Sequence, residues 1–99
     1  MAKLIHTENE LIKKDKSIKK IFGNEQSHIV NIQLKTGESI PEHDSKDPIL
    51  LIVRSGAVKF ICSDEEYALT DSDILFMEAK EMHSVEAVTD TDFLVVFLK

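Results

Sequence analysis

The sequence predicts an all-β protein of short antiparallel strands that form a sandwich or a barrel. Short segments in which apolar residues alternate or run continuously are separated at nearly regular spacing by turn residues. The 99 residues are enough for one domain, and a domain of this size buries about 65% of its unfolded surface. Hydrophobic residues make up 42% and charged residues 30%, which is typical of a folded chain and excludes intrinsic disorder.

The first predicted strands lie in the N-terminal third of the chain. Residues 17–22 are predicted as a strand, although the apolar positions of residues 11–22 also allow a helical stripe. Residues 27–35 alternate between apolar side chains, Val30, Ile32 and Leu34, and polar ones, which is the period of a half-buried strand. A turn at residues 36–38 follows. We expect one domain over residues 1–99, with an N-terminal strand region at 1–26 and a barrel at 27–98.

The middle of the chain contains a continuously apolar strand. Residues 49–53 follow Pro48, which is tolerated where a strand starts but not within a central strand. Ser55 and Gly56 form a turn that leads to the alternating residues 58–62, so the pattern predicts a hairpin of these two strands. Further strands are predicted at residues 67–69, 74–77, 83–87 and 93–98, and the last of these is again apolar on both faces.

Charge and hydropathy exclude several classes of function. The formal net charge is −6, and the only basic run lies within residues 13–20, so binding to a nucleic-acid backbone is not expected. We interpret that run as a solvated edge strand. There is no apolar stretch long enough for a membrane span and no signal-peptide pattern at the N-terminus, so no membrane partner and a cytoplasmic location are expected.

From Gly37 to Ala87 the chain resembles the cupin family. The frame of the first cupin motif, G-x5-H-x-H-x3-E-x6-G, falls on Gly37, His43, Ser45, Ile49 and Gly56. The frame of the second motif, G-x5-P-x-G-x2-H-x3-N, falls on Ser72, Glu78, Lys80, His83 and Ala87. The spacing agrees over about half of the chain, whereas the residue identities agree poorly. The resemblance implies an antiparallel jelly-roll β-barrel, the cupin-like double-stranded β-helix, and its frame agrees with the pattern of strands and turns.

The resemblance also implies a metal site, of which this chain keeps a part. Cupins typically hold one divalent transition metal through three histidines and a glutamate inside the barrel. His43 and His83 match two of these ligands, while Ser45 replaces a histidine and Ile49 replaces the glutamate. Two imidazoles alone bind Fe, Mn, Ni or Zn weakly, because water or another group must supply the missing ligands.

Asp47 is the candidate for a third ligand. It has the same strand parity as His43 and Ser45, and Pro48 favours an extended backbone at the residue before it. A 2-His-1-carboxylate set is sufficient for non-haem iron. The alternative interpretation is a solvated turn aspartate, because Asp-Pro is a common turn dipeptide. By the same parity, Glu42 and Asp44 are expected to point away from the interior.

Two functions follow from these observations. In the first, the protein binds a small molecule inside a mostly apolar barrel, and His43, Ser45 and His83 donate hydrogen bonds to it. In the second, it is a metal-dependent enzyme, such as an oxygenase or a sugar isomerase, that uses His43 and His83 with Asp47 or water. A regulatory sensor role would need a separate partner, because the chain has no helix-turn-helix segment. The sequence identifies neither catalytic residues nor the ligand.

Three other side chains have a structural and a functional interpretation. His28 is in phase with the apolar residues of its strand and is expected to be a structural histidine near the strand end. Cys62, the only cysteine, is expected to be a small core residue and cannot form an internal disulfide. Tyr67 is expected to pack, with a hydroxyl at a pocket mouth as the alternative.

The two strands that are apolar on both faces predict a homodimer. A single barrel has no second layer to cover its outside, so in each strand one of two sets is left on the surface or against a partner. The sets are Ile49, Leu51 and Val53 or Leu50 and Ile52 in the first strand, and Phe93, Val95 and Phe97 or Leu94, Val96 and Leu98 in the last. The alternative is that N-terminal residues of the same chain, among them Leu4, Ile18 and Phe22, cover this face.

Overall fold

The computed structural model describes residues 1–99, and its regular secondary structure consists almost entirely of strands. One short 3-10 helix, η1 (Glu10–Ile12), precedes nine strands. The strands are β1 (Lys16–Gly23), β2 (Ser27–Leu34), β3 (Ser39–His43), β4 (Ile49–Ser55), β5 (Val58–Cys62), β6 (Glu65–Leu69), β7 (Ile74–Met77), β8 (His83–Ala87) and β9 (Thr91–Leu98). Every predicted strand is present, and the strand interpretation of residues 17–22 is confirmed.

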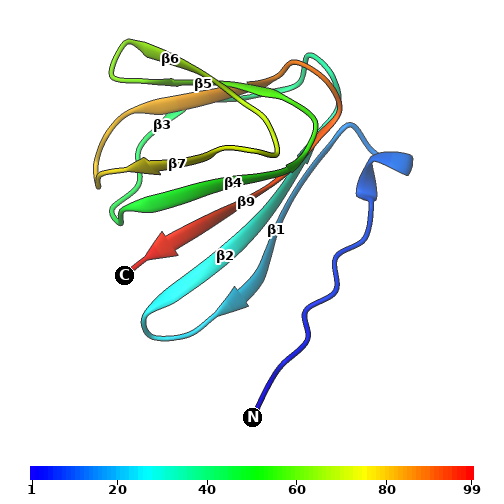
Figure 1. Cartoon of the computed structure of the whole chain (residues 1–99), viewed down its shortest axis with the longest axis vertical. Helices are drawn as coiled ribbons and strands as arrows, with labels where there is room; N and C mark the ends of the chain where they lie inside the picture. The colour runs from blue at the N-terminus through cyan, green and yellow to red at the C-terminus, as the bar shows by residue number, and fades with distance from the viewer.

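The strands pair in two antiparallel sheets that face each other (Figure 1). The five-stranded sheet has the order β1-β2-β9-β4-β7, and the four-stranded sheet has the order β3-β8-β5-β6. Neighbouring strands in each sheet are mostly distant in sequence, as in a jelly roll, where a long β-ribbon folds into two layers. The predicted jelly-roll fold is confirmed.

The hydrophobic core lies between the two sheets. Phe93 of β9 and Leu51 of β4 are 1% and 2% exposed in one sheet, and Phe60 of β5 is 2% exposed in the other. In the five-stranded sheet, alternate residues of β4 and β9 point into this core, and cross-strand pairs such as Leu51 with Val95 fix the register. A shift of one residue would turn each buried row outward, so burial itself specifies the pairing.

The predicted hairpin across Ser55 and Gly56 is wrong. Its two strands do not pair with each other: β4 pairs with β7 and β9, and β5 pairs with β6 and β8. Gly56 has φ 81°, and a Cβ there would clash with the carbonyl oxygen of Asp90 and lie 2.8 Å from Cα of Thr91. The turn carries the chain from one sheet to the other, which explains the need for glycine.

The tight hairpin of the molecule joins β5 to β6 instead. Its turn residues, Ser63 and Asp64, have φ 50° and 66°. Both central residues of a type I′ hairpin turn have positive φ, and aspartate tolerates this conformation better than most residues. Because no glycine marks this turn, its hairpin geometry was not visible in the sequence.

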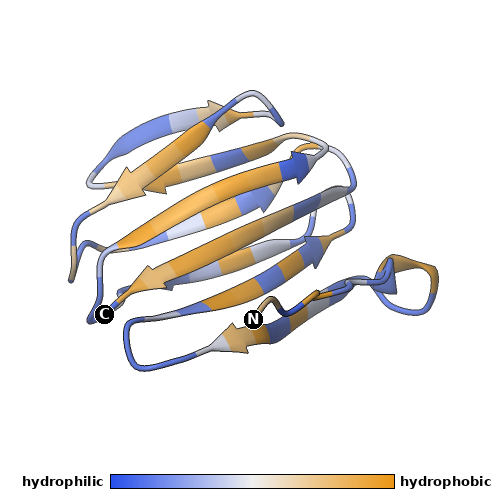
Figure 2. Cartoon of the chain, turned by 60° about the horizontal axis from the view of Figure 1, so that its bottom comes forward, coloured by the Kyte–Doolittle hydropathy of each residue, from blue (hydrophilic) through white to orange (hydrophobic).

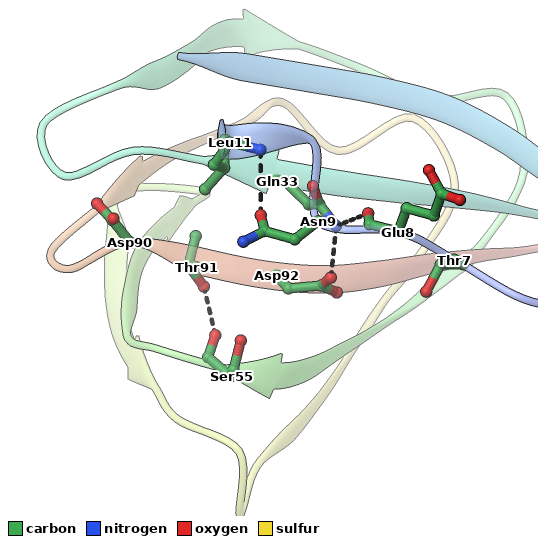
Figure 3. A pocket seen from close by; sticks show the side chains of 9 residues that line it. All are labelled: Thr7, Glu8, Asn9, Leu11, Gln33, Ser55, Asp90, Thr91 and Asp92. Atoms are coloured by element: carbon green, nitrogen blue, oxygen red, sulfur yellow. Dashed lines mark hydrogen bonds between the residues drawn. The ribbon is translucent and has the colours of Figure 1, made fainter. Parts of the chain in front are cut away.

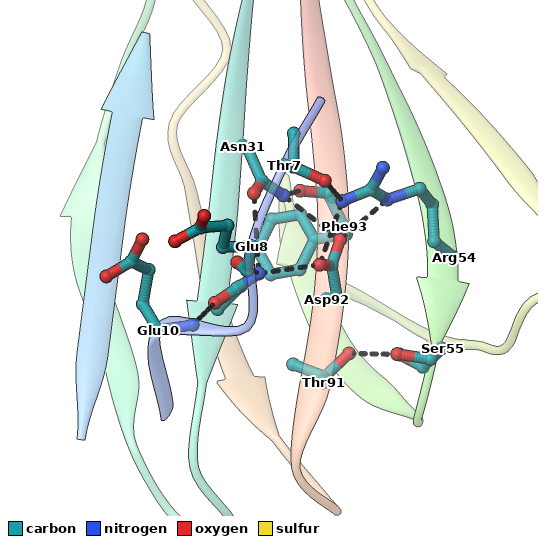
Figure 4. Close-up of polar contacts among 10 residues, drawn as sticks. Thr7, Glu8, Glu10, Asn31, Arg54, Ser55, Thr91, Asp92 and Phe93 are labelled. Atoms are coloured by element: carbon teal, nitrogen blue, oxygen red, sulfur yellow. Dashed lines mark hydrogen bonds and ion pairs between the residues drawn. The ribbon is translucent and has the colours of Figure 1, made fainter. Parts of the chain in front are cut away.

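The N-terminal segment is attached to the outside of the five-stranded sheet (Figure 4). Arg54 of β4 donates to the hydroxyl of Thr7 at 2.8 Å and pairs with Asp92 of β9 at 2.8 Å. The Gln33 side chain accepts from the backbone N–H of Glu10 at 2.8 Å and donates to the carbonyl oxygen of Glu8 at 2.9 Å. These contacts fix residues 7–10, after which β1 extends the edge of the sheet.

The outer face of the same sheet carries an apolar patch. Figure 2 shows the long apolar runs of β4 and β9 next to each other in the middle of the sheet. Outward residues pair across the strands: Leu50 with Phe76 and Val96, and Ile52 with Ile74 and Leu94. Ile74 and Phe76 of β7 are 66% and 50% exposed, so this face is covered only in part.

The structure contains no helix with the length and hydropathy that a membrane crossing requires.

Candidate functional site

An apolar cavity of about 290 Å³ lies between the two sheets. Eleven of its 15 lining residues are hydrophobic. These eleven are Ile18, Val30, Ile32, Ile40, Ile49, Leu51, Phe60, Val85, Phe93, Val95 and Phe97. Protein interiors are normally packed without voids much larger than a water molecule, so an open space of this size is a candidate binding site.

Four polar residues complete the lining: His43, Asp44, Ser45 and His83. His43 ends β3 and His83 begins β8, and the two residues are paired in the ladder between these strands. Their ring centroids lie 4.2 Å apart at an interplanar angle of 64°. His43 and Asp44 are exposed while His83 is buried, so the polar groups connect solvent with the apolar interior. The structure therefore brings together the two histidines that the sequence singled out.

The backbone fixes the tautomer of both histidines. Nδ1 of His43 lies 2.9 Å from the carbonyl oxygen of Pro41, and Nδ1 of His83 lies 2.9 Å from that of Glu81. A carbonyl oxygen only accepts hydrogen bonds, so each Nδ1 carries a proton and donates it. In the neutral ring the other nitrogen, Nε2, is then a bare acceptor.

His83 is held in its neutral form by its surroundings. It is 5% exposed and stacks on Phe60 with ring centroids 5.5 Å apart and an interplanar angle of 17°. Burial lowers the pKa of His83 below its ordinary value of 6.5, and the hydrogen bond to the Glu81 carbonyl opposes this only in part. At neutral pH His83 therefore has one free lone pair and no charge.

Ser45 and Asp47 form a local turn. The Ser45 hydroxyl donates to the carbonyl oxygen of Asp47 at 3.0 Å and accepts from its N–H at 3.2 Å. This is the pattern of an ST turn, and it uses the hydroxyl proton of Ser45. Asp47 itself is not among the residues that line the cavity.

Asp44 lines the cavity although strand alternation placed it on the opposite side. The pairing of β3 with β8 shifts register between Ile40 and His43, so simple alternation fails at the end of β3. Pro41 lies inside this irregular stretch. Proline within a strand marks an edge or a bulge, so Pro41 is the residue in the sequence that indicates the irregularity.

The side chains do not form a complete site for the metal that the fold family implies. The structure contains no group of three or more His, Cys, Asp or Glu side chains arranged to hold a metal ion. Ile49, which takes the place of the glutamate, is 3% exposed and lines the cavity as an apolar residue. The set is limited to two imidazole nitrogens, which does not fit a three-histidine, one-glutamate centre.

The three other candidate side chains have structural contacts. His28 stacks on Phe97 with ring centroids 4.2 Å apart, and its Nδ1 is buried without a hydrogen-bond partner. Cys62 is 8% exposed, with its Sγ 3.2 Å from Sδ of Met77, and burial raises the pKa of its thiol. Tyr67 packs against the core, and its hydroxyl donates to Glu65 at 3.0 Å.

A second cavity, of about 400 Å³, lies beside the N-terminal segment (Figure 3). Leu11 is the only hydrophobic residue among the nine that line it. Its polar groups already bond to one another. The Gln33 side chain donates to the Asp92 carboxylate at 2.8 Å, and the Thr91 hydroxyl donates to the backbone carbonyl oxygen of Ser55 at 2.8 Å. We interpret this cavity as part of the network that attaches the N-terminal segment.

Comparison with solved structures places the fold among cupins. An RmlC-like cupin with a double-stranded β-helix fold from Methanocaldococcus jannaschii is similar with TM-score 0.85 at 21% identity, over 99% of this chain and 91% of that one. A conserved Streptococcus pyogenes protein of unknown function has TM-score 0.79 at 21% identity, over 88% and 76% of the two chains. KdgF from a Halomonas species has TM-score 0.78 at 18% identity, over 84% and 77%. No curated protein sequence matches the chain.

The two facing sheets and the cavity between them define a ligand-binding domain of the cupin type. Residues 30–96 match the family model described as the AraC-like ligand binding domain, which covers β2 to β9 almost completely. The chain therefore belongs to the AraC-like ligand-binding domain family.

Proposed function

We propose that the protein binds a small molecule in the cavity between its sheets, with His43, Ser45 and His83 at the polar end. The observation that carries this proposal is an apolar space of about 290 Å³ whose four polar residues include two adjacent histidines. Ligand sites commonly combine an apolar wall with a few polar groups that orient the ligand. Membership of a ligand-binding family supports the same function.

A thermal-shift screen tests this proposal. A library of small molecules of about 8–15 heavy atoms is screened against the wild type and against Val95→Phe, which places a ring in the cavity and narrows it. We expect compounds that raise the Tm of the wild type, because a ligand that binds only the folded state stabilises it, and that leave Val95→Phe unchanged. A screen without such compounds, or compounds that stabilise both proteins equally, contradicts binding in this cavity.

The second candidate function is a metal-dependent enzyme of the oxygenase or sugar isomerase type. It is favoured by one observation: both Nδ1–H groups donate to backbone carbonyls, an arrangement common in metal-binding histidines. His43 and His83 would then hold Fe, Mn, Ni or Zn, with Asp47 or water as further ligands. Metal analysis of protein purified without a histidine tag distinguishes the two functions, since the first requires no bound metal.

We also propose that two copies associate through the outer apolar face of the five-stranded sheet, formed by Leu50, Ile52, Ile74, Phe76, Leu94 and Val96. These six residues are all apolar and form two continuous rows across β7, β4 and β9, while the neighbouring charges of Arg54 and Asp92 pair with each other. The N-terminal arm is attached to the same face at Thr7, and its Leu4 remains 95% exposed. A second copy supplies both a matching face and a matching arm, as a two-fold interface requires.

Light scattering tests the association. We expect a mass of twice 11.2 kDa at micromolar concentration, and a shift towards 11.2 kDa for Ile52→Glu, which places a charge in the middle of the face. Ile61→Glu is the matched control, because Ile61 is 38% exposed on the other sheet. A wild-type mass of 11.2 kDa, or equal effects of the two variants, contradicts the proposed interface.

A further inference from the structure

The four polar residues of the cavity share one property: none has a free proton to give to a ligand. His43 and His83 have used their Nδ1 protons on backbone carbonyls, and Ser45 has used its hydroxyl proton on the carbonyl of Asp47. An ionised Asp44 carboxylate also accepts only. In the neutral rings Nε2 is an acceptor, and together with the remaining lone pair of Ser45 and the carboxylate it makes this end of the cavity a set of acceptors.

The rest of the cavity restricts the body of the ligand. Eleven hydrophobic side chains line about 290 Å³, roughly twice the ~150 Å³ of an apolar cavity that holds one benzene ring. A polyhydroxylated molecule such as a free sugar would place hydroxyls against this wall without partners, and each unpaired polar group costs about 1–3 kcal/mol. The cavity therefore suits an apolar body of about two fused rings.

We propose, on the basis of the binding function above, that the ligand is an apolar molecule with one hydrogen-bond-donating head group, a hydroxyl or an ammonium. Its body lies between the sheets. An ammonium head group donates to Nε2 of both His83 and His43, whereas a hydroxyl has one proton and donates to one of them. The Asp44 carboxylate favours a cationic head group at the exposed end of the site. A carboxylate or phosphate head group would face acceptors only, so it is excluded by unpaired lone pairs and by repulsion from Asp44.

Calorimetry with head-group variants of one ring system tests the proposal. The probes are 2-naphthylmethanol, 2-naphthylmethylamine and 2-naphthoate, with L-arabinose as the polyol, at pH 8 after dialysis against a chelator. We expect the alcohol or the amine to bind at least tenfold more tightly than the naphthoate, and arabinose not to bind. The comparison of alcohol with amine shows which donor the site prefers.

Variants of the histidines assign the head-group contact. His83→Phe keeps a ring that stacks on Phe60 and removes the acceptor. His43→Phe removes the acceptor at an exposed position and keeps a ring edge-on to His83. We expect each to weaken binding of the amine, whose ammonium group donates to both rings, about tenfold. His28→Phe is the matched control, since His28 also stacks on a phenylalanine but does not line the cavity, and it is expected to bind normally.

The outcomes separate the head group from the cavity. Naphthoate that binds as tightly as the alcohol overturns the donor assignment while binding in the cavity stands. Binding of arabinose overturns the apolar body. Binding of none of the probes, with compounds still found in the thermal-shift screen, overturns the ligand class but not the binding function, whereas failure in both experiments overturns both. Binding of the alcohol only after addition of Zn²⁺ or Mn²⁺ overturns direct donation and favours the metal site.

Discussion

The unfilled space between the sheets predicts that a larger side chain at Val95 stabilises the fold. Val95 is 6% exposed, and its cross-strand neighbours Val30 and Leu51 also line the cavity, so Val95 lies in the middle of one wall. Val95→Phe adds four carbon atoms to a space of about 290 Å³. Each newly buried carbon group contributes up to about 0.8 kcal/mol, and loss of rotamer freedom and imperfect fit offset part of this. We expect a net gain of about 1–2 kcal/mol.

Chemical and thermal unfolding measure this change. A gain of about 1 kcal/mol raises the Tm of a domain of this size by about 4–8 °C. Val58→Phe is the matched control: Val58 is 1% exposed in the packed part of the core and does not line the cavity, so the added ring is expected to destabilise by about 1–3 kcal/mol. Equal destabilisation by both variants refutes the reasoning, because it means that the space at Val95 is filled in solution.

Three further predictions concern a turn, the buried histidine and metal. Gly56→Ala is expected to lower the free energy of unfolding in urea by more than about 2 kcal/mol, because the positive φ alone costs about 1–2 kcal/mol and the new Cβ meets the Asp90 carbonyl. An unchanged urea midpoint contradicts this. The free energy of unfolding is expected to fall as pH drops below about 6.5, because the unfolded chain then binds a proton that folded His83 with its lowered pKa does not, at up to about 1.4 kcal/mol per pH unit. Burial also lowers the pKa of His28, so His83→Phe is expected to reduce this slope without abolishing it, and an unchanged slope excludes His83 as a source. Metal binding is expected to be weak and sub-stoichiometric after dialysis against a chelator, and tight one-to-one binding of iron, manganese or nickel contradicts this. If metal does bind, an unchanged metal affinity of Asp47→Ala shows that Asp47 is not a ligand.

Strand positions were predictable because local pattern determines them in this chain. The alternation of Val30, Ile32 and Leu34 and the apolar run that begins at Ile49 both lie in strands of the structure. The expected half-burial of β2 is wrong, because Asn31 and Gln33 are 5% and 3% exposed and Gln33 bonds to the N-terminal segment. Which strands pair is decided by tertiary packing, and for that reason the hairpin across Gly56 was predicted wrongly. A turn between two sheets and a turn within one hairpin use the same residue types.

The site was predictable in its histidines and not in its chemistry. His43 and His83 were singled out by the resemblance to the cupin motifs, and the structure places them next to each other. The direction of their hydrogen bonds depends on backbone carbonyls at Pro41 and Glu81, whose positions no residue pattern reveals. The place of Asp44 in the cavity depends on the irregular end of β3, which alternation does not describe.

The nitrogen-15 chemical shifts of the histidine rings test the central claim most directly. In ¹⁵N-histidine-labelled protein at pH 8, bare and protonated ring nitrogens have distinct shifts, so His43 and His83 are expected to show a protonated Nδ1 and a bare Nε2. Addition of 2-naphthylmethylamine, whose ammonium group has a proton for each ring, is expected to shift Nε2 of both residues and to leave His6 and His28 unchanged. Shifts confined to His6 or His28, or no shift of any ring at saturating probe, would contradict a ligand site between the two sheets.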